Sequence, residues 1–292
     1  MDRMQDAAQA GQSRPTHDGG AHGMRAADGA LGTLVLRVAY DGAAYAGFAE
    51  QRDQVTVAGE LRRAVETLLR REVDLTCAGR TDAGVHALSQ YVSFSVEDPS
   101  ELALTQRRWL RAMDALLPRD IAVRAVYTAP AGFSARFDAR ARTYIYRIAD
   151  RPDRPVLTRP HVWWHRYPLD EEAMAAGAAH LIGEHDFKSF CKVASAVGKP
   201  TCRNVMHTSF ARASELGEEV LAFTITGNAF LHSMVRTIVG TLVEVGAHRR
   251  DPAWVGEVLA RCDRTAAGPT APADGLVFAD VAYDAGQLTP VV

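Results

Sequence analysis

The chain has 292 residues, 47% of them hydrophobic, and a formal net charge of −2 at pH 7. This size and composition suit a globular protein with one large hydrophobic core or two ordinary ones. No apolar run approaches the length of a membrane span, and the segment that begins at Met1 has no signal-peptide pattern. We therefore expect a cytoplasmic protein with no membrane partner.

The cysteines give no sign of a disulfide framework or of a metal site. Cys77, Cys191, Cys202 and Cys262 are far apart and form no Cys-x-x-Cys pair. Cys191, Cys202 and His207 also lack a regular zinc-binding spacing. We expect reduced thiols and no bound metal.

The elements of the first half alternate between strands and helices. Residues 1–32 are rich in Ala, Gly, Asp and Gln without an apolar period, which predicts a disordered tail. Apolar periodicity then predicts an N-terminal half over 33–130, with strands at 34–40, 73–77, 91–96 and 121–127 and helices over 57–70 and 104–117.

A polar segment connects the second and third of these strands. Residues 77–87 read CAGRTDAGVHA, with Asp82 near the middle. If the backbone stays extended, Arg80 and Asp82 share a face, and the carboxylate has a guanidinium beside it. Gly79 and Gly84 allow positive φ and a close approach of a bulky ligand. Asp82 is a candidate catalytic residue, and an Arg–Asp pair that only staples a turn is the alternative.

The second half, predicted over 131–284, loosely repeats the order of the first. Its expected strands lie at 142–149, 203–212, 220–226 and 276–283, its helices lie over 170–182, 230–248 and 251–261, and residues 285–292 form a short C-terminal tail. Strands joined by both hairpins and helices indicate an α+β fold of two similar halves, with mixed or antiparallel sheets. A ligand is expected in a cleft between the halves.

Arginine is concentrated in one part of the chain. Residues 105–154 contain eleven arginines and no lysine, with five aspartates and no glutamate, which is a local net charge of +6. Arg107, Arg108 and Arg111 fall on one predicted helix and repel one another unless an anion lies between them. Phosphates of a nucleic acid would relieve this repulsion, since guanidinium groups suit them. A high-GC coding sequence would produce the same bias, and both explanations stay open.

Two further residues are candidates for a site. Arg236 lies in a narrow polar stripe on an otherwise apolar helix, so its guanidinium either reaches solvent or meets a carboxylate, for which Asp82 is the expected partner. Arg142, Tyr144 and Tyr146 share one strand face. Aromatic and cationic side chains together suit a flipped base, since stacking contributes ~1–3 kcal/mol per base. Ordinary packing is the alternative for this face.

Several motifs occur in order from about residue 33 to 284. They are Tyr40-Asp41-Gly42 with Tyr45 to Phe48, Thr56 to Leu61, Gly79 to Ala87, Phe133 to Phe137 with Arg142-Thr143-Tyr144, Gly183 to Phe187, Asn228 to Arg236, and Thr270 to Ala273 with Gly275-Leu276. Together they resemble the signatures of tRNA pseudouridine synthases of the A type.

The resemblance implies the pseudouridine synthase fold with an RNA-binding cleft. It also implies isomerisation of uridine in the anticodon stem-loop of tRNA, by a homodimer with no cofactor and no metal. Carried over by position, Asp82 is the catalytic aspartate, Tyr144 stacks on the target base, and Arg236 is the basic partner of the aspartate. Arg80 and His86, in the same motif as Asp82, are expected to bind substrate. The carboxylate either attacks C1′ or stabilises a cationic sugar and removes a ribose proton.

The chain departs from the family pattern at several positions, and two other functions compete with this one. The departures are Phe48, Ala49, Glu50, Ala58, Ser233 and Thr237. One competing function is a tRNA chaperone that binds without turnover. The other is a nucleoside hydrolase, which needs a second carboxylate that the motif around Asp82 does not offer.

Overall fold

The computed structural model describes residues 30–292, so most of the expected disordered tail, 1–32, lies outside the described residues. The strands are β1 (Gly32–Tyr40), β2 (Thr76–Cys77), β3 (His86–Val96), β4 (Ile121–Ala129), β5 (Ala141–Asp150), β6 (Trp163–His165), β7 (Gly183–Asp186), β8 (Cys202–Glu215), β9 (Glu218–Gly227), β10 (Leu276–Ala282) and β11 (Thr289–Pro290). The helices are α1 (Val57–Leu69), α2 (Pro99–Leu102), α3 (Gln106–Leu116), α4 (Glu171–Ala179), α5 (Val193–Ala196), α6 (Met234–Gly246) and α7 (Trp254–Arg261), with short 3-10 helices η1 (Arg159–His161), η2 (Phe187–Phe190) and η3 (Arg264–Ala266).

The strands of residues 30–292 form one 11-stranded sheet. Its order is β11-β4-β1-β3-β10-β5-β9-β8-β7, with β2 paired to β3 and β6 paired to β5. Most neighbours are antiparallel, but β10 runs parallel to β3 and β5 runs parallel to β6. The mixed α+β architecture is therefore confirmed, and the two halves share a continuous sheet where separate sheets were expected.

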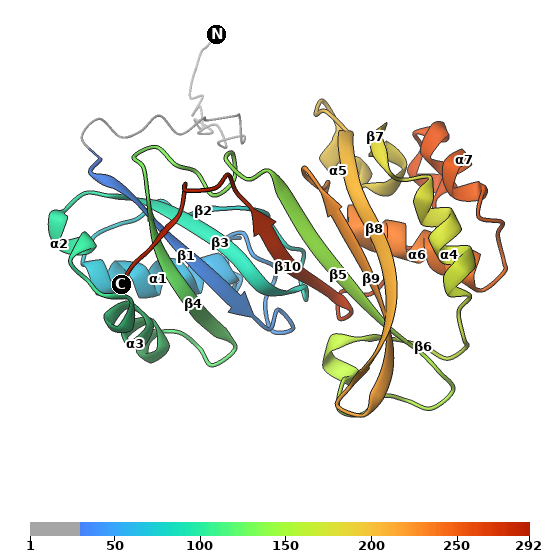
Figure 1. Ribbon diagram of the computed structural model, residues 1–292, viewed down its shortest axis with the longest axis horizontal. Coiled ribbons are helices and arrows are strands. Elements are labelled where there is room, and N and C mark those ends of the chain that lie inside the picture. The colour runs from blue at the N-terminus through green and yellow to red at the C-terminus, as the bar shows by residue number, and fades with distance from the viewer. Residues whose placement is uncertain (1–29) are drawn as a thin grey trace, which may run out of the picture.

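The last long strand joins the two halves. β10 lies between β3 and β5, with Val277 opposite His86 and Phe278 opposite Tyr144 (Figure 1). It comes from the C-terminal end of the chain, so only long-range pairing places it there. The predicted tail, 285–292, also returns to the sheet, because Thr289 of β11 pairs with Thr128 of β4.

The helices pack with the half of the sheet to which they belong. In Figure 1, α1 and α3 lie with the N-terminal strands, and α4, α6 and α7 lie with β5, β8 and β9. Most buried apolar side chains belong to one cluster that includes members from both halves, such as Phe94 and Phe223. Within residues 30–292, no helix combines the length and the hydrophobicity needed to cross a bilayer.

Helix α6 begins at Met234, later than the predicted start at residue 230. Ser233 precedes it in the left-handed region, with φ of 59°, and this turn separates the helix from the loop before it. Phe230 belongs to that loop, and its ring packs against Tyr144 with centroids 5.1 Å apart. The prediction was wrong here because an apolar residue in a packed loop has the same pattern as one in a helix.

Candidate active site

Asp82 lies in a tight loop, 78–85, between β2 and β3. The N–H of Phe48 donates to the carbonyl of Thr81 at 3.1 Å, and the N–H of Gly84 donates to the carbonyl of Tyr45 at 3.3 Å. Within the loop, the N–H of Val85 donates to the carbonyl of Asp82 at 3.2 Å. The loop is therefore held by backbone hydrogen bonds to the segment after β1 and by one within the loop.

The segment that follows β1 packs directly against this loop. The hydroxyls of Tyr40 and Thr81 are 2.8 Å apart, so Thr81 is directed inward and away from solvent. Gly47 has φ of 107°, and a Cβ there would lie 3.0 Å from the Thr81 carbonyl and 3.3 Å from the carbonyl carbon of Asp82. Only glycine satisfies both the backbone angle and the close approach.

Three side chains surround the carboxylate of Asp82. The hydroxyl of Ser233 donates to Oδ2 at 2.8 Å, and Nη1 of Arg236 donates to the same oxygen at 3.1 Å. Nε2 of His232 lies 3.4 Å from Oδ1. The expected ion pair between Arg236 and Asp82 is thus confirmed. In the described part of the chain, the contacts of this carboxylate are a hydroxyl, a guanidinium and an imidazole, and none is an acid.

Arg80 does not hold the position next to the carboxylate that an extended backbone predicted. Its side chain is exposed, and among the described residues the ion pairs of Asp82 are with Arg236 and His232. The positions next to the carboxylate are taken by His232, Ser233 and Arg236, which come from a segment distant in sequence. Arg80 lies instead near Cys77. Burial raises the pKa of the Cys77 thiol to about 11, and the charge of Arg80 opposes this rise.

The loop before β10 fixes the guanidinium of Arg236. Nε of Arg236 donates to the carbonyl of Ala271 at 2.8 Å, and the N–H of Ala271 donates back to the carbonyl of Arg236 at 3.1 Å. Ala271 is buried, so this pair is shielded from water. The guanidinium is thus oriented before any substrate binds, which reduces the entropy lost on binding.

Tyr144 lies on β5 and reaches the same site. Its ring makes edge-on contacts with Phe230 and Phe278, with centroids 5.1 and 4.9 Å away. Burial raises the pKa of its hydroxyl, and the charges of Tyr40 and Asp82 add to this effect. The structure therefore brings Asp82, Arg236 and Tyr144 together from the 78–85 loop, α6 and β5.

Arg142 and Tyr146, which share this strand face with Tyr144, are packing residues. Arg142 is buried, and it donates hydrogen bonds to the carbonyls of Ala78, Ala139 and Asn228. Burial lowers the pKa of its guanidinium. Tyr146 is fully buried and donates to the carbonyl of Pro272 at 2.8 Å. For both residues, the structure supports the alternative of ordinary packing.

A pocket of about 500 Å³ opens beside this cluster, with cationic and hydroxyl side chains at its rim. Its lining residues are Lys192, Val193, Ala194, Ser233, Thr237, Arg264 and Thr270. This volume lies in the range of pockets that hold small-molecule ligands. Because Ser233 both lines the pocket and contacts Asp82, the pocket lies next to the Asp82 carboxylate.

Comparison with known proteins decides the family. The sequence matches the family model described as tRNA pseudouridine synthase over residues 37–138 and 178–284. The chain belongs to the tRNA pseudouridine synthase family. The family and enzyme class predicted from the sequence motifs are therefore confirmed.

Relatives from several bacteria cover most of this synthase. It is 42% identical to tRNA pseudouridine synthase A of Methylococcus capsulatus over 250 residues, which are 86% of this chain and 89% of the relative. It is 42% identical to tRNA pseudouridine synthase A of Brevibacillus brevis, over 84% of this chain and 97% of the relative. The protein of that name from Streptomyces griseus is 41% identical, over 87% and 88% of the two chains.

His86 of this synthase lies apart from the contacts of Asp82. It begins β3 and is buried, with Nδ1 2.9 Å from a carboxylate oxygen of Asp41 and 3.1 Å from the backbone N of Gly42. Burial lowers the pKa of its imidazole, and the charge of Asp41 opposes this. The expected role of His86 in substrate binding stays a prediction.

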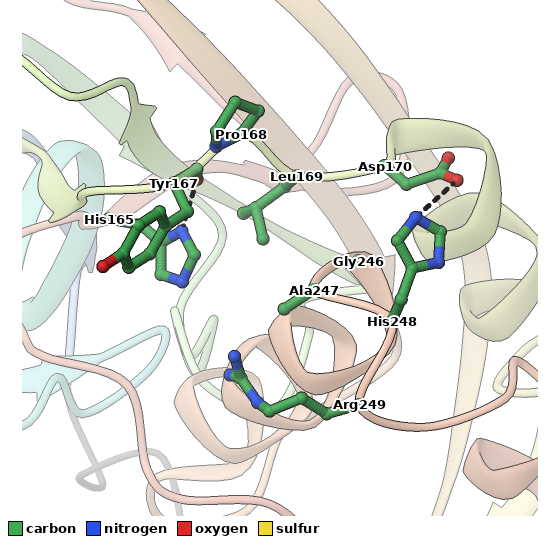
Figure 2. Close-up of a pocket in the computed structure, with 9 residues that line it drawn as sticks. All are labelled: His165, Tyr167, Pro168, Leu169, Asp170, Gly246, Ala247, His248 and Arg249. Atoms are coloured by element: carbon green, nitrogen blue, oxygen red, sulfur yellow. Dashed lines mark hydrogen bonds and ion pairs between the residues drawn. The ribbon is translucent and has the colours of Figure 1, made fainter.

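A second pocket of the synthase, of about 510 Å³, lies at the other end of α6. Figure 2 shows Asp170 directed toward His248, with a 3.3 Å ion pair, and His165 directed toward the backbone of Tyr167. Asp170 also accepts a hydrogen bond from the N–H of Ala173 as the N-cap of α4. The acidic residue of this pocket caps a helix, and none of the candidate site residues from the sequence lines the pocket, so it is a weaker candidate for catalysis.

Two site residues of the synthase were not identified from sequence as contacts of Asp82. His232 and Ser233 fall inside the motif Asn228 to Arg236, and Ser233 was noted only as a departure from the family pattern. The helix predicted through both residues concealed their role, because it does not include the turn that directs them to Asp82. The motif itself was the available signal.

Proposed function

We propose that this synthase isomerises uridine to pseudouridine in the anticodon stem-loop of tRNA, with Asp82 as the catalytic residue. The observation that carries the proposal is the unequal hydrogen bonding of the two Asp82 carboxylate oxygens. Ser233 and Arg236 both donate to Oδ2, whereas among residues 30–292 the contact of Oδ1 is the longer one with His232. The carboxylate is therefore oriented through one oxygen, and the other is available to a substrate.

The reaction requires one carboxylate and no external reactant, because uridine and pseudouridine are isomers. The N1–C1′ bond breaks, the uracil turns in the pocket, and C5 bonds to C1′. The C5 hydrogen leaves as a proton, and N1 gains one. Oδ1 of Asp82 can attack C1′ or remove a ribose proton, and both routes use the same oxygen.

Other groups around the site suit the remaining parts of an RNA substrate. Tyr144 lies near Asp82 and is 7% exposed. Stacking of the target base on its ring would offset the few kcal/mol, roughly, that flipping a base out of its loop costs. Arg80 and Arg136 are exposed cations near Cys77, and Arg264 lines the pocket. We assign these three guanidinium groups to backbone phosphates.

The geometry favours neither of the two competing functions. A hydrolase needs a second carboxylate to position water, and no acid contacts Asp82 within residues 30–292. Binding of tRNA without turnover does not require a carboxylate that two donors orient next to a pocket. Neither the fold nor the family comparisons support the chaperone function.

The assembly and location of the synthase are part of the same proposal. We propose a homodimer in the cytoplasm, which the resemblance of the motifs to the A-type synthases supports. Sedimentation of the purified chain should give the mass of two copies at micromolar concentration. A single-copy mass at that concentration contradicts the proposed dimer but leaves the isomerase assignment untouched.

Tritium release tests the isomerisation. The wild-type chain, incubated with tRNA labelled with tritium at uridine C5, should release tritium, because C5 loses its hydrogen only on isomerisation. Asp82→Asn should abolish release while tRNA still binds in a filter assay. Asp114→Asn, the same change at an exposed position on α3, is the control and should act like wild type. Substantial release by Asp82→Asn contradicts the role of Asp82.

Mapping of modified sites tests the substrate. Total tRNA from a strain that lacks this chain should be missing pseudouridine in the anticodon stem-loop, and the purified protein should restore it. Loss of pseudouridine in another arm of tRNA would contradict the proposed position without contradicting the reaction.

A further inference from the structure

Two histidines and an aspartate gather outside the Asp82 site. Asp41 follows β1, His86 begins β3, and His161 ends η1, and among the described residues their nitrogen and carboxylate oxygen atoms lie within 4.8 Å of one another. Nδ1 of His86 is 2.9 Å from Oδ1 of Asp41, and Nε2 of His161 is 4.0 Å from Oδ2 of the same residue. The carboxylate therefore lies next to both imidazoles.

These separations are close to those of a zinc-type site. Zinc binds nitrogen and oxygen at about 2.0–2.2 Å, which places neighbouring ligands of a tetrahedron roughly 3.4 Å apart. The two measured separations lie on either side of this value. Small rotations close the difference, since the side chains of Asp41 and His161 are 40% and 45% exposed while that of His86 is fixed by burial.

Nδ1 of His86 has two competing neighbours. Nδ1 faces a donor, the N–H of Gly42 at 3.1 Å, and also an acceptor, the carboxylate of Asp41. If Nδ1 accepts from Gly42, its lone-pair side lies against a negative charge. If Nδ1 carries the proton, two N–H donors, those of His86 and Gly42, face each other. Nδ1 has one lone pair, so a cation shared by Nδ1 and the carboxylate takes the place of the Gly42 hydrogen bond and removes the repulsion of the first arrangement.

The segment that carries His161 is held in place by its own hydrogen bonds. The carboxylate of Glu218 accepts from the N–H of Val156 at 2.7 Å and from the N–H of Thr158 at 2.9 Å. The N–H of His161 donates to the carbonyl of Thr158 at 2.8 Å. Val162, the next residue, is buried in a small apolar cluster. The segment that carries His161 is therefore anchored at both ends.

We propose that Asp41, His86 and His161 form a binding site for one divalent transition-metal cation of the zinc class. Two imidazoles and one carboxylate suit such a cation better than magnesium or calcium, which prefer oxygen ligands. The expectation of no metal rested on the cysteine spacing and on the family resemblance, and neither addresses these three residues. The cation would link two segments of the N-terminal half to η1 of the C-terminal half.

Titration of the full-length chain tests the site. After dialysis against a chelator and then against metal-free buffer, wild type should bind about one equivalent of Zn²⁺ by calorimetry at neutral pH. His161→Ala should weaken this binding by at least about 100-fold, since even the loss of a group that only supports a ligand costs about 10- to 100-fold. His207→Ala, the same change at an exposed histidine on β8, is the matched control and should bind as wild type does.

A second variant and a second cation keep the test decisive. Asp41→Asn should also weaken Zn²⁺ binding, and Zn²⁺ should raise the melting temperature of wild type and of His207→Ala but not of His161→Ala. Co²⁺ should bind without a thiolate charge-transfer band. The proposal is overturned if wild type does not bind Zn²⁺, if His161→Ala and Asp41→Asn bind it as wild type does, or if the cobalt spectrum shows thiolate ligands.

Discussion

Ser233 donates a hydrogen bond of 2.8 Å to Oδ2 of Asp82 from a backbone in the left-handed region, with φ of 59°. This conformation costs an ordinary residue about 1–2 kcal/mol, so the rest of the structure must hold it. It ends the loop before α6 and places His232 and Ser233 beside the carboxylate. A residue noted from sequence only as a departure from the family pattern is thus a direct contact of the Asp82 carboxylate.

Ser233→Ala should slow turnover more than it weakens tRNA binding. The variant keeps the Arg236 contact but loses a hydrogen bond to a charged group, which is worth about 1.5–3 kcal/mol. We expect tritium release to fall roughly 10- to 100-fold. Ser233→Gly also lacks the hydroxyl but adopts positive φ easily, so it should be as slow as Ser233→Ala. A Gly variant as active as wild type would show that backbone strain, and not the hydroxyl, explains the loss.

Two substitutions at Tyr144 separate the ring from the hydroxyl. If the ring stacks on the target base, Tyr144→Phe should bind tRNA with little loss. Tyr144→Ala should weaken binding by about 1–3 kcal/mol, the usual contribution of one stacked base. Binding is measured by filter retention at fixed salt, and the melting temperature checks that the Ala variant is folded at the assay temperature. Equal losses in both variants would assign the role to the hydroxyl.

Gly47→Ala should impair catalysis although Gly47 lies outside the 78–85 loop. A Cβ would lie 3.0 Å from the carbonyl of Thr81 and 3.2 Å from the N of Ala83, so the loop that carries Asp82 must shift. A displacement of about 1 Å can cost about 100-fold in rate. We expect tritium release to fall by up to that factor.

Gly217→Ala is the matched control for this substitution. Gly217 also has positive φ, 82°, but nothing lies within 4 Å of a Cβ built there. The two variants therefore share the backbone strain, and of the two only Gly47→Ala brings a Cβ against the 78–85 loop. Similar losses of turnover in both would show that strain alone is responsible.

The stability contributed by Glu218 should depend on pH. Hydrogen bonds from the Thr158 hydroxyl and from the N–H groups of Val156 and Thr158 lower the pKa of this carboxyl from 4.5 to about 2. A carboxylate with a lowered pKa in the folded state stabilises the fold above its unfolded pKa, and this stabilisation is lost as pH falls through the folded pKa. The contribution should therefore be complete above pH 4.5 and should disappear as pH approaches about 2.

Thermal melts of Glu218→Gln between neutral and acidic pH check this expectation. The variant should melt below wild type at neutral pH, and the difference should shrink as the pH falls. Glu219→Gln, the same change at the exposed neighbouring residue, should differ little from wild type at any pH. A Glu218→Gln difference that stays constant with pH would mean that its carboxyl pKa is not lowered in the folded protein.

Local patterns in the sequence predicted most of the elements and the central pair of the site. Alternating apolar residues predicted β1, β4 and β5, because side chains of a strand alternate between its faces whatever the strand pairs with. The stripe of small and polar residues on α6 led to the pairing of Arg236 with Asp82, since a guanidinium among apolar residues needs a partner. These inferences hold because they depend on backbone period and on the cost of burying charge.

The tertiary structure alone decided which neighbours each group has. The assignment of Arg80 to the carboxylate failed because Arg236 and His232, from a distant segment, hold the positions next to it. Likewise, β10 joins the halves through hydrogen bonds to β3 and β5, which local periodicity does not encode. The amino-acid sequence determined which side chains could do chemistry. Long-range pairing and the turn at Ser233 determined which of them meet, because contacts between distant segments depend on how the whole chain packs.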